Sequence, residues 1–291
     1  MSLILTIGLP AIEILVDEGI DVVCAEDYIL NKNKYKKIAI LNLMPIKIDT
    51  ELDLLRRLDK SGGDLLIDFI NISTRKSSRV CNEYTSDFYR TLEDIKDTNY
   101  DGVIITGAPV EQMEFEEVDY WDELKDIIDF SKTNSKSTLY ICWAAQAGLY
   151  KDYDIKKHPL EKKCFGVFEH KVNKDSKIVE NFDELFFAPH SRHTTIDIND
   201  IKNNSELNLV SYSDKAGAYI IANTRDIYVM GHSEYAKETL DKEYKRDIEK
   251  EVEIEIPINY YPEDDPFREP EVKWKEHSEL LFKNWINNYL I

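Results

Sequence analysis

The apolar residues of this chain form short continuous runs separated by stripes with helical spacing. Four runs have the length of buried strands and lie at residues 37–43, 64–72, 101–107 and 137–142. Two intervening stretches repeat apolar residues every three or four positions, at Leu52, Leu55 and Leu58 and at Val118, Trp121, Leu124 and Ile128. This alternation predicts an α/β fold with a doubly wound, mostly parallel sheet and helices on both faces.

The second half of the chain is less regular. Three further apolar runs predict strands at residues 207–212, 217–222 and 227–231. We expect a charged helix over residues 234–250, followed at 251–256 by a solvated edge strand or an extended segment. A turn-rich connector at 259–266 leads to a last helix, whose inner face carries Trp274, His277, Leu281 and Trp285. Since no linker or repeat interrupts the pattern, we expect one domain over residues 1–291 with extra C-terminal segments.

Charge narrows the choice of partners. The chain carries 56 acidic and 37 basic residues, for a net charge of −19. Such a surface repels phosphate backbones and anionic membranes, so the expected partners are small molecules and neither nucleic acid nor membrane. The start of the chain lacks the basic residues of a signal peptide, and no apolar run has membrane-spanning length. The four cysteines show neither close pairing nor metal-ligand spacing, so we expect a cytoplasmic protein without a metal or tightly held cofactor.

Cys142 ends one of the predicted strands, and small residues such as Ala144 follow it. A strand that turns abruptly into a helix lifts the residue at the turn clear of the sheet, which is the nucleophile-elbow arrangement. The positive end of the helix favours a thiolate there, and the Trp143 backbone N–H is a candidate oxyanion donor. The alternative is a buried, inert cysteine, which spacing alone does not exclude.

His232 and Glu234 follow a later predicted strand. Because alternate residues of a strand share one face, Glu234 could orient His232 as the general base for Cys142. An H-x-E triplet is also common by chance. Ligands of parallel sheets bind at the carboxyl ends of the strands, where these residues would meet Lys47 and the turn at 109–111. This convergence indicates an active site more strongly than any one of the residues.

Seven longer motifs stand in a fixed order along the chain. They are Leu-Asn-Leu-Met-Pro-Ile-Lys at 41–47, Ile-Thr-Gly-Ala-Pro-Val-Glu at 105–111, Tyr-Ile-Cys-Trp-Ala-Ala-Gln-Ala-Gly at 140–148, Phe-Gly-Val-Phe at 165–168, Pro-His-Ser-Arg-His at 189–193, Gly-His-Ser-Glu-Tyr at 231–235 and Asn-Tyr-Tyr-Pro at 259–262. In order and spacing they resemble the homoserine O-acyltransferases of methionine biosynthesis, from about Leu9 to the last helix. Those enzymes are similar in fold to class I glutamine amidotransferases, a flavodoxin-like arrangement.

The resemblance implies catalytic roles. Cys142 corresponds to an acyl-thioester nucleophile, His232 to its general base and Glu234 to the partner of that base. Lys47 and the Trp143 amide are the candidates for the oxyanion hole. The chain departs from the usual family pattern at two positions, with Tyr84 in place of histidine and Ala144 in place of glycine.

The resemblance also implies an acceptor site. Lys163, Ser191 and Arg246 correspond to substrate-binding residues, and Glu243 lies three residues before Arg246 on the same helix face. The carboxylate of homoserine suits the guanidinium of Arg246, and its ammonium suits Glu243. Without the resemblance, Glu243 and Arg246 would be an ordinary surface pair.

Glu111 bears on the choice of acyl donor. In the family that the chain resembles, this position separates acetyl from succinyl users, with glutamate on the acetyl side. A succinyl group ends in a carboxylate, which Glu111 would repel in a partly buried pocket. We therefore expect a homoserine O-acetyltransferase that uses acetyl-CoA through a Cys142 thioester, with ping-pong kinetics. If Glu111 points to solvent, it does not repel a succinyl carboxylate, and succinyl-CoA is the alternative donor.

Two other functions stay open. A glutamine amidotransferase-type thiol hydrolase would use the same nucleophile and base, but its elbow usually carries glycine where this chain has Tyr140 and Ala144. A non-catalytic ligand-binding module of the same fold would not need the thiol. We also expect a homodimer through the apolar parts of the first half.

Overall fold

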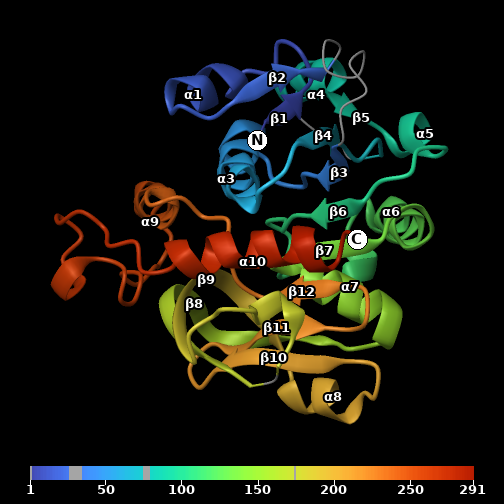
Figure 1. Cartoon of the computed structure of the whole chain (residues 1–291). Helices are drawn as coiled ribbons and strands as arrows, with labels where there is room; N and C mark the ends of the chain where they lie inside the picture. Colours follow the sequence, from blue (N-terminus) through green and yellow to red (C-terminus); the bar gives the residue numbers. More distant parts are fainter. Residues whose placement is uncertain (1, 26–34, 75–78, 174) are drawn as a thin grey trace.

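One mixed sheet forms the centre of the computed structural model, which describes residues 2–25, 35–74, 79–173 and 175–291 (Figure 1). Its strands in the described residues are β1 (Leu3–Leu5), β2 (Val22–Cys24), β3 (Lys36–Leu41), β4 (Leu65–Ile70), β5 (Tyr89–Arg90), β6 (Gly102–Ile105), β7 (Ser137–Ile141), β8 (Lys157–Val172), β9 (Leu185–Ile196), β10 (Asn208–Ser213), β11 (Gly217–Ala222) and β12 (Ile227–Val229). They are ordered β2-β1-β4-β3-β6-β7-β12-β11-β10-β8-β9, and β5 pairs with β4.

Along the sheet, each strand from β2 as far as β12 is parallel to its neighbour. From β12 to the other edge at β9, neighbouring strands are antiparallel. The described helices are α1 (Ala11–Asp17), α3 (Lys47–Leu58), α4 (Arg79–Phe88), α5 (Leu92–Ile95), α6 (Trp121–Asn134), α7 (Trp143–Tyr153), α8 (Ile198–Asn203), α9 (Thr239–Glu249) and α10 (Lys275–Asn288). Helices α1, α3 and α10 pack into one apolar core, and α5, α6 and α7 pack into a second core. The prediction of a doubly wound, mostly parallel α/β sheet is confirmed.

The long β8–β9 ribbon has no counterpart in the sequence-based prediction. None of the first eight residues of β8 is buried, so no apolar run marks this strand. Its register with β9 places Phe165 opposite Ser191 and Cys164 opposite Arg192. The pairing therefore brings two of the sequence motifs together at one end of the ribbon.

Two glycines mark places where C-terminal segments approach the sheet closely. Gly166 has a φ of +137°, and an added Cβ would lie 2.3 Å from the backbone nitrogen of Ile258. Ile258 accepts from the Val167 N–H at 2.8 Å and lies along β8, while residues 251–256 before it form no strand. At Gly102 an added Cβ would meet the Trp285 ring at 2.7 Å, so α10 packs directly on β6.

Helix α9 begins at Thr239, later than the helix predicted over residues 234–250. Tertiary contacts explain the difference, because they hold the preceding segment in an irregular path. The Tyr235 carbonyl accepts from Arg57 at 2.8 Å and from Trp274 at 2.9 Å. The predicted docking of the last helix is confirmed, since the Trp285 indole donates to Ser137 at 2.8 Å. Among the helices described, none is long and apolar enough to span a membrane.

Candidate active site

Cys142 stands at the junction of β7 and α7. Its φ of 53° and ψ of −114° are unusual for a residue other than glycine, and they form the sharp turn of a nucleophile elbow. The residue is buried, and its N–H donates to the Val229 carbonyl at 2.7 Å, which holds the strained backbone in place. The side chain therefore lies at the carboxyl end of β7, beside the first turn of α7.

His232 lies next to Cys142 because β12 pairs in parallel with β7. The imidazole shares the cavity with Cys142, and its Nδ1 lies 2.6 Å from Glu234 Oε1. The Tyr235 ring stacks on the imidazole, with 4.1 Å between ring centres. Burial lowers the pKa of His232, but the negative charges of Cys142 and Glu234 outweigh burial and raise this pKa well above its usual value. The arrangement is a thiol and an imidazole supported by a carboxylate.

These groups face a cavity of about 350 Å³ at the carboxyl edge of the parallel strands. It brings together most of the site residues expected from the sequence, namely Glu111, Cys142, Lys163, Ser191, His232, Glu243 and Arg246. They come from the loop after β6, the β7 elbow, the β8–β9 ribbon, the end of β12 and α9. Glu234 lies behind His232 and does not line the cavity.

Gly107 and Trp143 define a place for an oxyanion. An added Cβ at Gly107 would lie 3.4 Å from the Cys142 Cβ and 3.7 Å from the Trp143 backbone nitrogen. Glycine at this position therefore leaves both the thiol and the start of α7 uncovered. The first N–H groups of a helix have no carbonyl partner within the helix, so they can donate to a negatively charged oxygen on Cys142-bound substrate. Gly107 is a site residue that the sequence analysis did not select.

Lys47 lies after the carboxyl end of β3, where its side chain contacts buried neighbours. Its ammonium donates to the Asn42 carbonyl at 2.6 Å and lies 5.5 Å from the centre of the Tyr89 ring. Glu51 faces the same buried group and accepts from the hydroxyls of Tyr89 and Tyr84 at 2.6 and 2.8 Å. Lys47 is absent from the lining of the Cys142 cavity. The role of Lys47 as an oxyanion donor stays a prediction, as does that of the amide at the start of α7.

Four charged side chains form one wall of the cavity. Lys163 Nζ lies 2.7 Å from Glu243 Oε1 and 3.4 Å from Asp247 Oδ2, and the Ser191 hydroxyl donates to Glu243 at 2.6 Å. Arg246 lies 2.6 Å from Asp247 Oδ1 and 3.6 Å from Glu243. Two cations thus face two carboxylates, which matches the charges of an amino-acid zwitterion. Asp247 was not predicted from the sequence, although its place four residues after Glu243 puts both on one helix face.

Glu111 turns into the cavity. Only 16% of its side chain is exposed, and its Oε1 lies 4.0 Å from His193 Nε2. Burial raises the pKa of Glu111, and a hydrogen bond from the His193 backbone with the positive charges of His232 and Lys163 offsets part of this rise. The alternative in which Glu111 points to solvent is wrong. His193 is a further neighbour that the sequence analysis quoted only within a motif.

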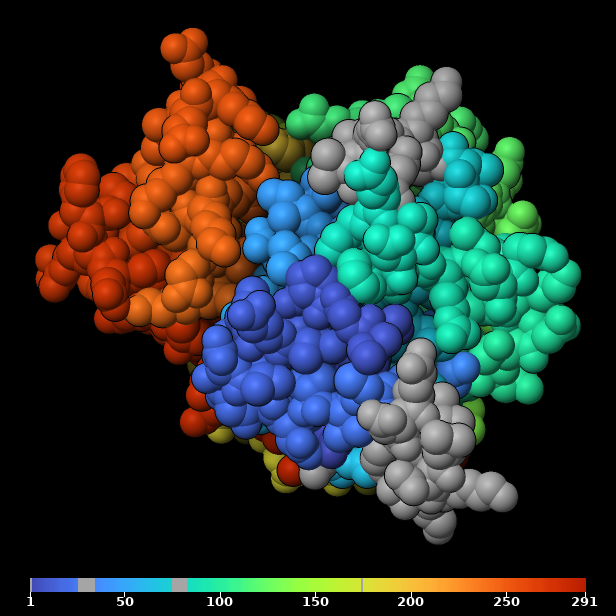
Figure 2. All heavy atoms as spheres, turned by 90° about the horizontal axis from the view of Figure 1, so that it is seen from above, coloured from blue at the N-terminus to red at the C-terminus, as the bar shows by residue number. Residues whose placement is uncertain are grey.

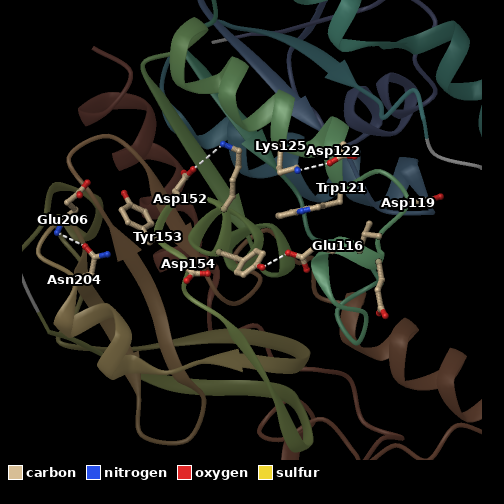
Figure 3. A pocket seen from close by; sticks show the side chains of 14 residues that line it. Glu116, Asp119, Trp121, Asp122, Lys125, Asp152, Tyr153, Asp154, Asn204 and Glu206 are labelled. Atoms are coloured by element: carbon tan, nitrogen blue, oxygen red, sulfur yellow. Dashed lines mark hydrogen bonds and ion pairs between the residues drawn. The ribbon is translucent and has the colours of Figure 1, made fainter.

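Another hollow lies away from Cys142 and is shown in Figure 3. It has about 920 Å³ and is lined mainly by carboxylates near α6 and α7. Asp122 pairs with Lys125 at 2.8 Å, Asp152 pairs with Lys132, and Glu116 accepts from a tyrosine hydroxyl. This hollow contains no cysteine or histidine. Across the described part of the chain, no cluster of three or more His, Cys, Asp or Glu is placed to hold a metal ion.

Comparison with known proteins identifies the family. A family model described as homoserine O-succinyltransferase matches residues 2–291. The chain belongs to this family. Two relatives named homoserine O-acetyltransferase, from Bacillus cereus and Bacillus anthracis, are each 46% identical over 293 residues, which cover 100% of this chain and 97% of each relative. The family resemblance inferred from the seven motifs is confirmed.

Solved structures share the fold of this homoserine O-acyltransferase family member at low identity. A glutamine amidotransferase from Thermotoga maritima has a TM-score of 0.58 at 15% identity, covering 87% of this chain and 98% of that chain. A second one, from Methylobacillus flagellatus, has a TM-score of 0.53 at 11% identity, covering 87% and 94%. At these identities the likeness concerns the fold alone, and it confirms the expected glutamine amidotransferase-like sheet.

Asp53 of α3 lies behind the catalytic residues. Its carboxylate accepts from the Ala236 N–H at 3.2 Å and from the Thr239 hydroxyl at 3.1 Å. Burial and the nearby charge of Glu234 raise the pKa of Asp53 to about 7, against the opposing effects of these hydrogen bonds and of Arg56. The buried carboxylate thus fixes the segment between Glu234 and α9.

We expect Asp53→Asn to make the free energy of unfolding less dependent on pH. Because the folded pKa of about 7 exceeds the ordinary 3.8, the contribution of Asp53 is complete below pH 3.8 and is lost as the pH rises through 7. The wild type should lose about 4 kcal/mol more than the variant over this interval. Asparagine can keep both hydrogen bonds, since the Thr239 hydroxyl can also accept. Denaturant unfolding of both proteins at pH 4 and pH 8 measures this difference, and parallel pH dependences would contradict it.

Proposed function

We propose that this chain is a homoserine O-acetyltransferase, which transfers acetyl from acetyl-CoA to the hydroxyl of L-homoserine through a thioester on Cys142. The observation that carries the proposal is the position of Glu111 in the same cavity as Cys142 and His232. The full-length identity of 46% to proteins named homoserine O-acetyltransferase supports the same activity.

The first half-reaction acetylates the enzyme. The Cys142 thiolate attacks the carbonyl carbon of acetyl-CoA, and the carbonyl oxygen takes up the negative charge beside the Trp143 N–H. The intermediate then collapses with cleavage of the bond between the acyl carbon and the CoA sulfur. His232 gives its proton to the departing sulfur. The products are acetyl-Cys142, free CoA thiol and a neutral imidazole.

The second half-reaction transfers the acetyl group to the acceptor. L-homoserine places its ammonium near Glu243 and Asp247 and its carboxylate near Lys163 and Arg246. Its hydroxyl gives a proton to neutral His232 as the oxygen attacks the thioester carbon. Cleavage of the bond to Cys142 releases O-acetylhomoserine and restores the thiolate–imidazolium pair. Glu234 holds the imidazole orientation and stabilises its charge in both steps.

Succinyl-CoA is the second candidate donor, and the description of the matching family model favours it. The far end of a succinyl group carries a carboxylate, whereas an acetyl group ends in a methyl. A succinyl group on Cys142 would bring this carboxylate toward Glu111, whose side chain is mostly buried. Two like charges in such a site repel strongly, so acetyl is the better donor.

The test uses wild-type enzyme and steady-state kinetics. We expect O-acetylhomoserine and free CoA from acetyl-CoA and L-homoserine, parallel double-reciprocal lines for the two substrates, and little product from succinyl-CoA. Equal or better use of succinyl-CoA would show that the enzyme is a homoserine O-succinyltransferase. Glutaminase activity without acyl transfer would favour a thiol hydrolase instead. A homodimer through the first half stays a prediction.

A further inference from the structure

A second cavity, of about 370 Å³, adjoins the one that contains Cys142. It lies between residues 44–46 with the start of α3 on one side and residues 236–242 on the other. Figure 2 shows the surface here, where the orange side chains of the α9 region stand beside the light-blue ones of α3. Four residues line both cavities: Met44, Tyr235, Glu243 and Arg246. The cavities therefore meet beside the Tyr235 ring, which stacks on His232.

The chemistry fixes the side from which CoA leaves. His232 protonates the departing CoA sulfur in the first half-reaction and takes the proton of the homoserine hydroxyl in the second. The CoA sulfur and the homoserine oxygen must therefore occupy the same place beside the imidazole, one after the other. This place lies on one side of the acyl group. In the proposed function the acyl chain extends toward Glu111, and the loop that carries Glu111 lines the first cavity and not the second. The rest of CoA must therefore pass toward the residues that line both cavities.

We propose that the second cavity holds the pantetheine arm of the acyl-CoA donor, an inference that rests on the proposed acyl transfer. Its lining combines apolar groups of Ile46 and Leu52 with the hydroxyl of Thr50, which suits a narrow chain of methylenes, methyls and amides. Ile46 is 56% exposed, so an apolar arm would cover a side chain that is otherwise in water. Lys242, with 67% of its side chain exposed and its Nζ 3.8 Å from Asp49 Oδ1, would exchange this ion pair for the phosphates beyond the arm.

The experiment compares two acetyl donors that differ in the arm. Acetyl-CoA carries the whole arm and the phosphates, whereas S-acetyl-N-acetylcysteamine ends after the first amide. Ile46→Glu places a negative charge on the exposed wall of the cavity, and Thr50→Trp fills the cavity from α3. Ile7→Glu is the matched control, because Ile7 is 57% exposed and lines neither cavity. The measurement is kcat/KM for each donor with saturating L-homoserine.

We expect Ile46→Glu to lower kcat/KM for acetyl-CoA about tenfold and Thr50→Trp to lower it further, with values for the short thioester within twofold of wild type. Ile7→Glu should change neither donor. Unchanged use of acetyl-CoA by Ile46→Glu and a folded Thr50→Trp would overturn the proposal, since the arm would then lie elsewhere. Equal losses with both donors would also overturn it, because the effect would arise at Cys142. Failure of the proposed function is a separate result, seen as absent acetyl transfer by the wild type with either donor.

Discussion

Cys142→Ser should lower kcat/KM for acetyl transfer to L-homoserine by about a thousandfold or more. The serine hydroxyl is far less acidic than a thiol, so it is not held as an anion beside His232 and attacks the thioester poorly. The substitution changes one atom, and the elbow backbone keeps its hydrogen bond to Val229, so the fold should persist. Release of free CoA and formation of O-acetylhomoserine measure the loss.

The control for this variant is Cys24→Ser, at the edge strand β2 and away from the cavity. It should keep activity within about twofold, since surface substitutions outside special features have small effects. A Cys142→Ser protein that retains activity within tenfold of wild type would contradict a covalent mechanism. A ligand-binding module of the same fold predicts unchanged ligand affinity in both variants and no turnover in the wild type.

Glu111→Gly should raise kcat/KM for succinyl-CoA by about a hundredfold or more and lower that for acetyl-CoA. Glycine removes the carboxylate that faces the acyl chain and leaves room for the two additional carbons and the terminal carboxylate of succinate. Removing repulsion between like charges in a partly buried site is worth several kcal/mol, which corresponds to this factor. The measurement is kcat/KM for both donors at saturating L-homoserine.

Glu111→Gln separates charge from space, because glutamine keeps the size of the side chain and removes its charge. It should gain part of the succinyl-CoA use of Glu111→Gly. The wild type should also discriminate less as the pH falls, since burial raises the pKa of Glu111 and the carboxyl group is protonated sooner than an exposed glutamate. Unchanged donor preference in both variants would show that Glu111 does not select the donor.

Much of the site was predictable because the catalytic groups stand at strand ends. The apolar run before Cys142 and the small residues after it indicated the elbow, and the parallel pairing of β7 with β12 brings His232 beside it. The position of Glu111 likewise follows from the turn after β6. These features depend on local sequence and on the rule that ligands of parallel sheets bind at the carboxyl ends of strands.

Other features depend on contacts between distant segments, which no local pattern carries. Lys47 is the last residue of the motif at 41–47, and its side chain turns back to Asn42 and Tyr89. Residues 234–238 have the charge and spacing of a helix. Their irregular path is set instead by contacts with Arg57, Asp53 and Trp274. The first half of β8 is largely exposed, so it lacks the apolar run that reveals the other strands.

The most direct test of the mechanism is the mass of the intact protein after rapid mixing with each acyl-CoA in the absence of acceptor. We expect acetyl-CoA to add one acetyl group to the wild type and none to Cys142→Ser, and L-homoserine to remove the adduct. Succinyl-CoA should add little. No adduct under conditions where the enzyme turns over would contradict the Cys142 thioester, and a succinyl adduct formed as readily as the acetyl one would contradict the role of Glu111.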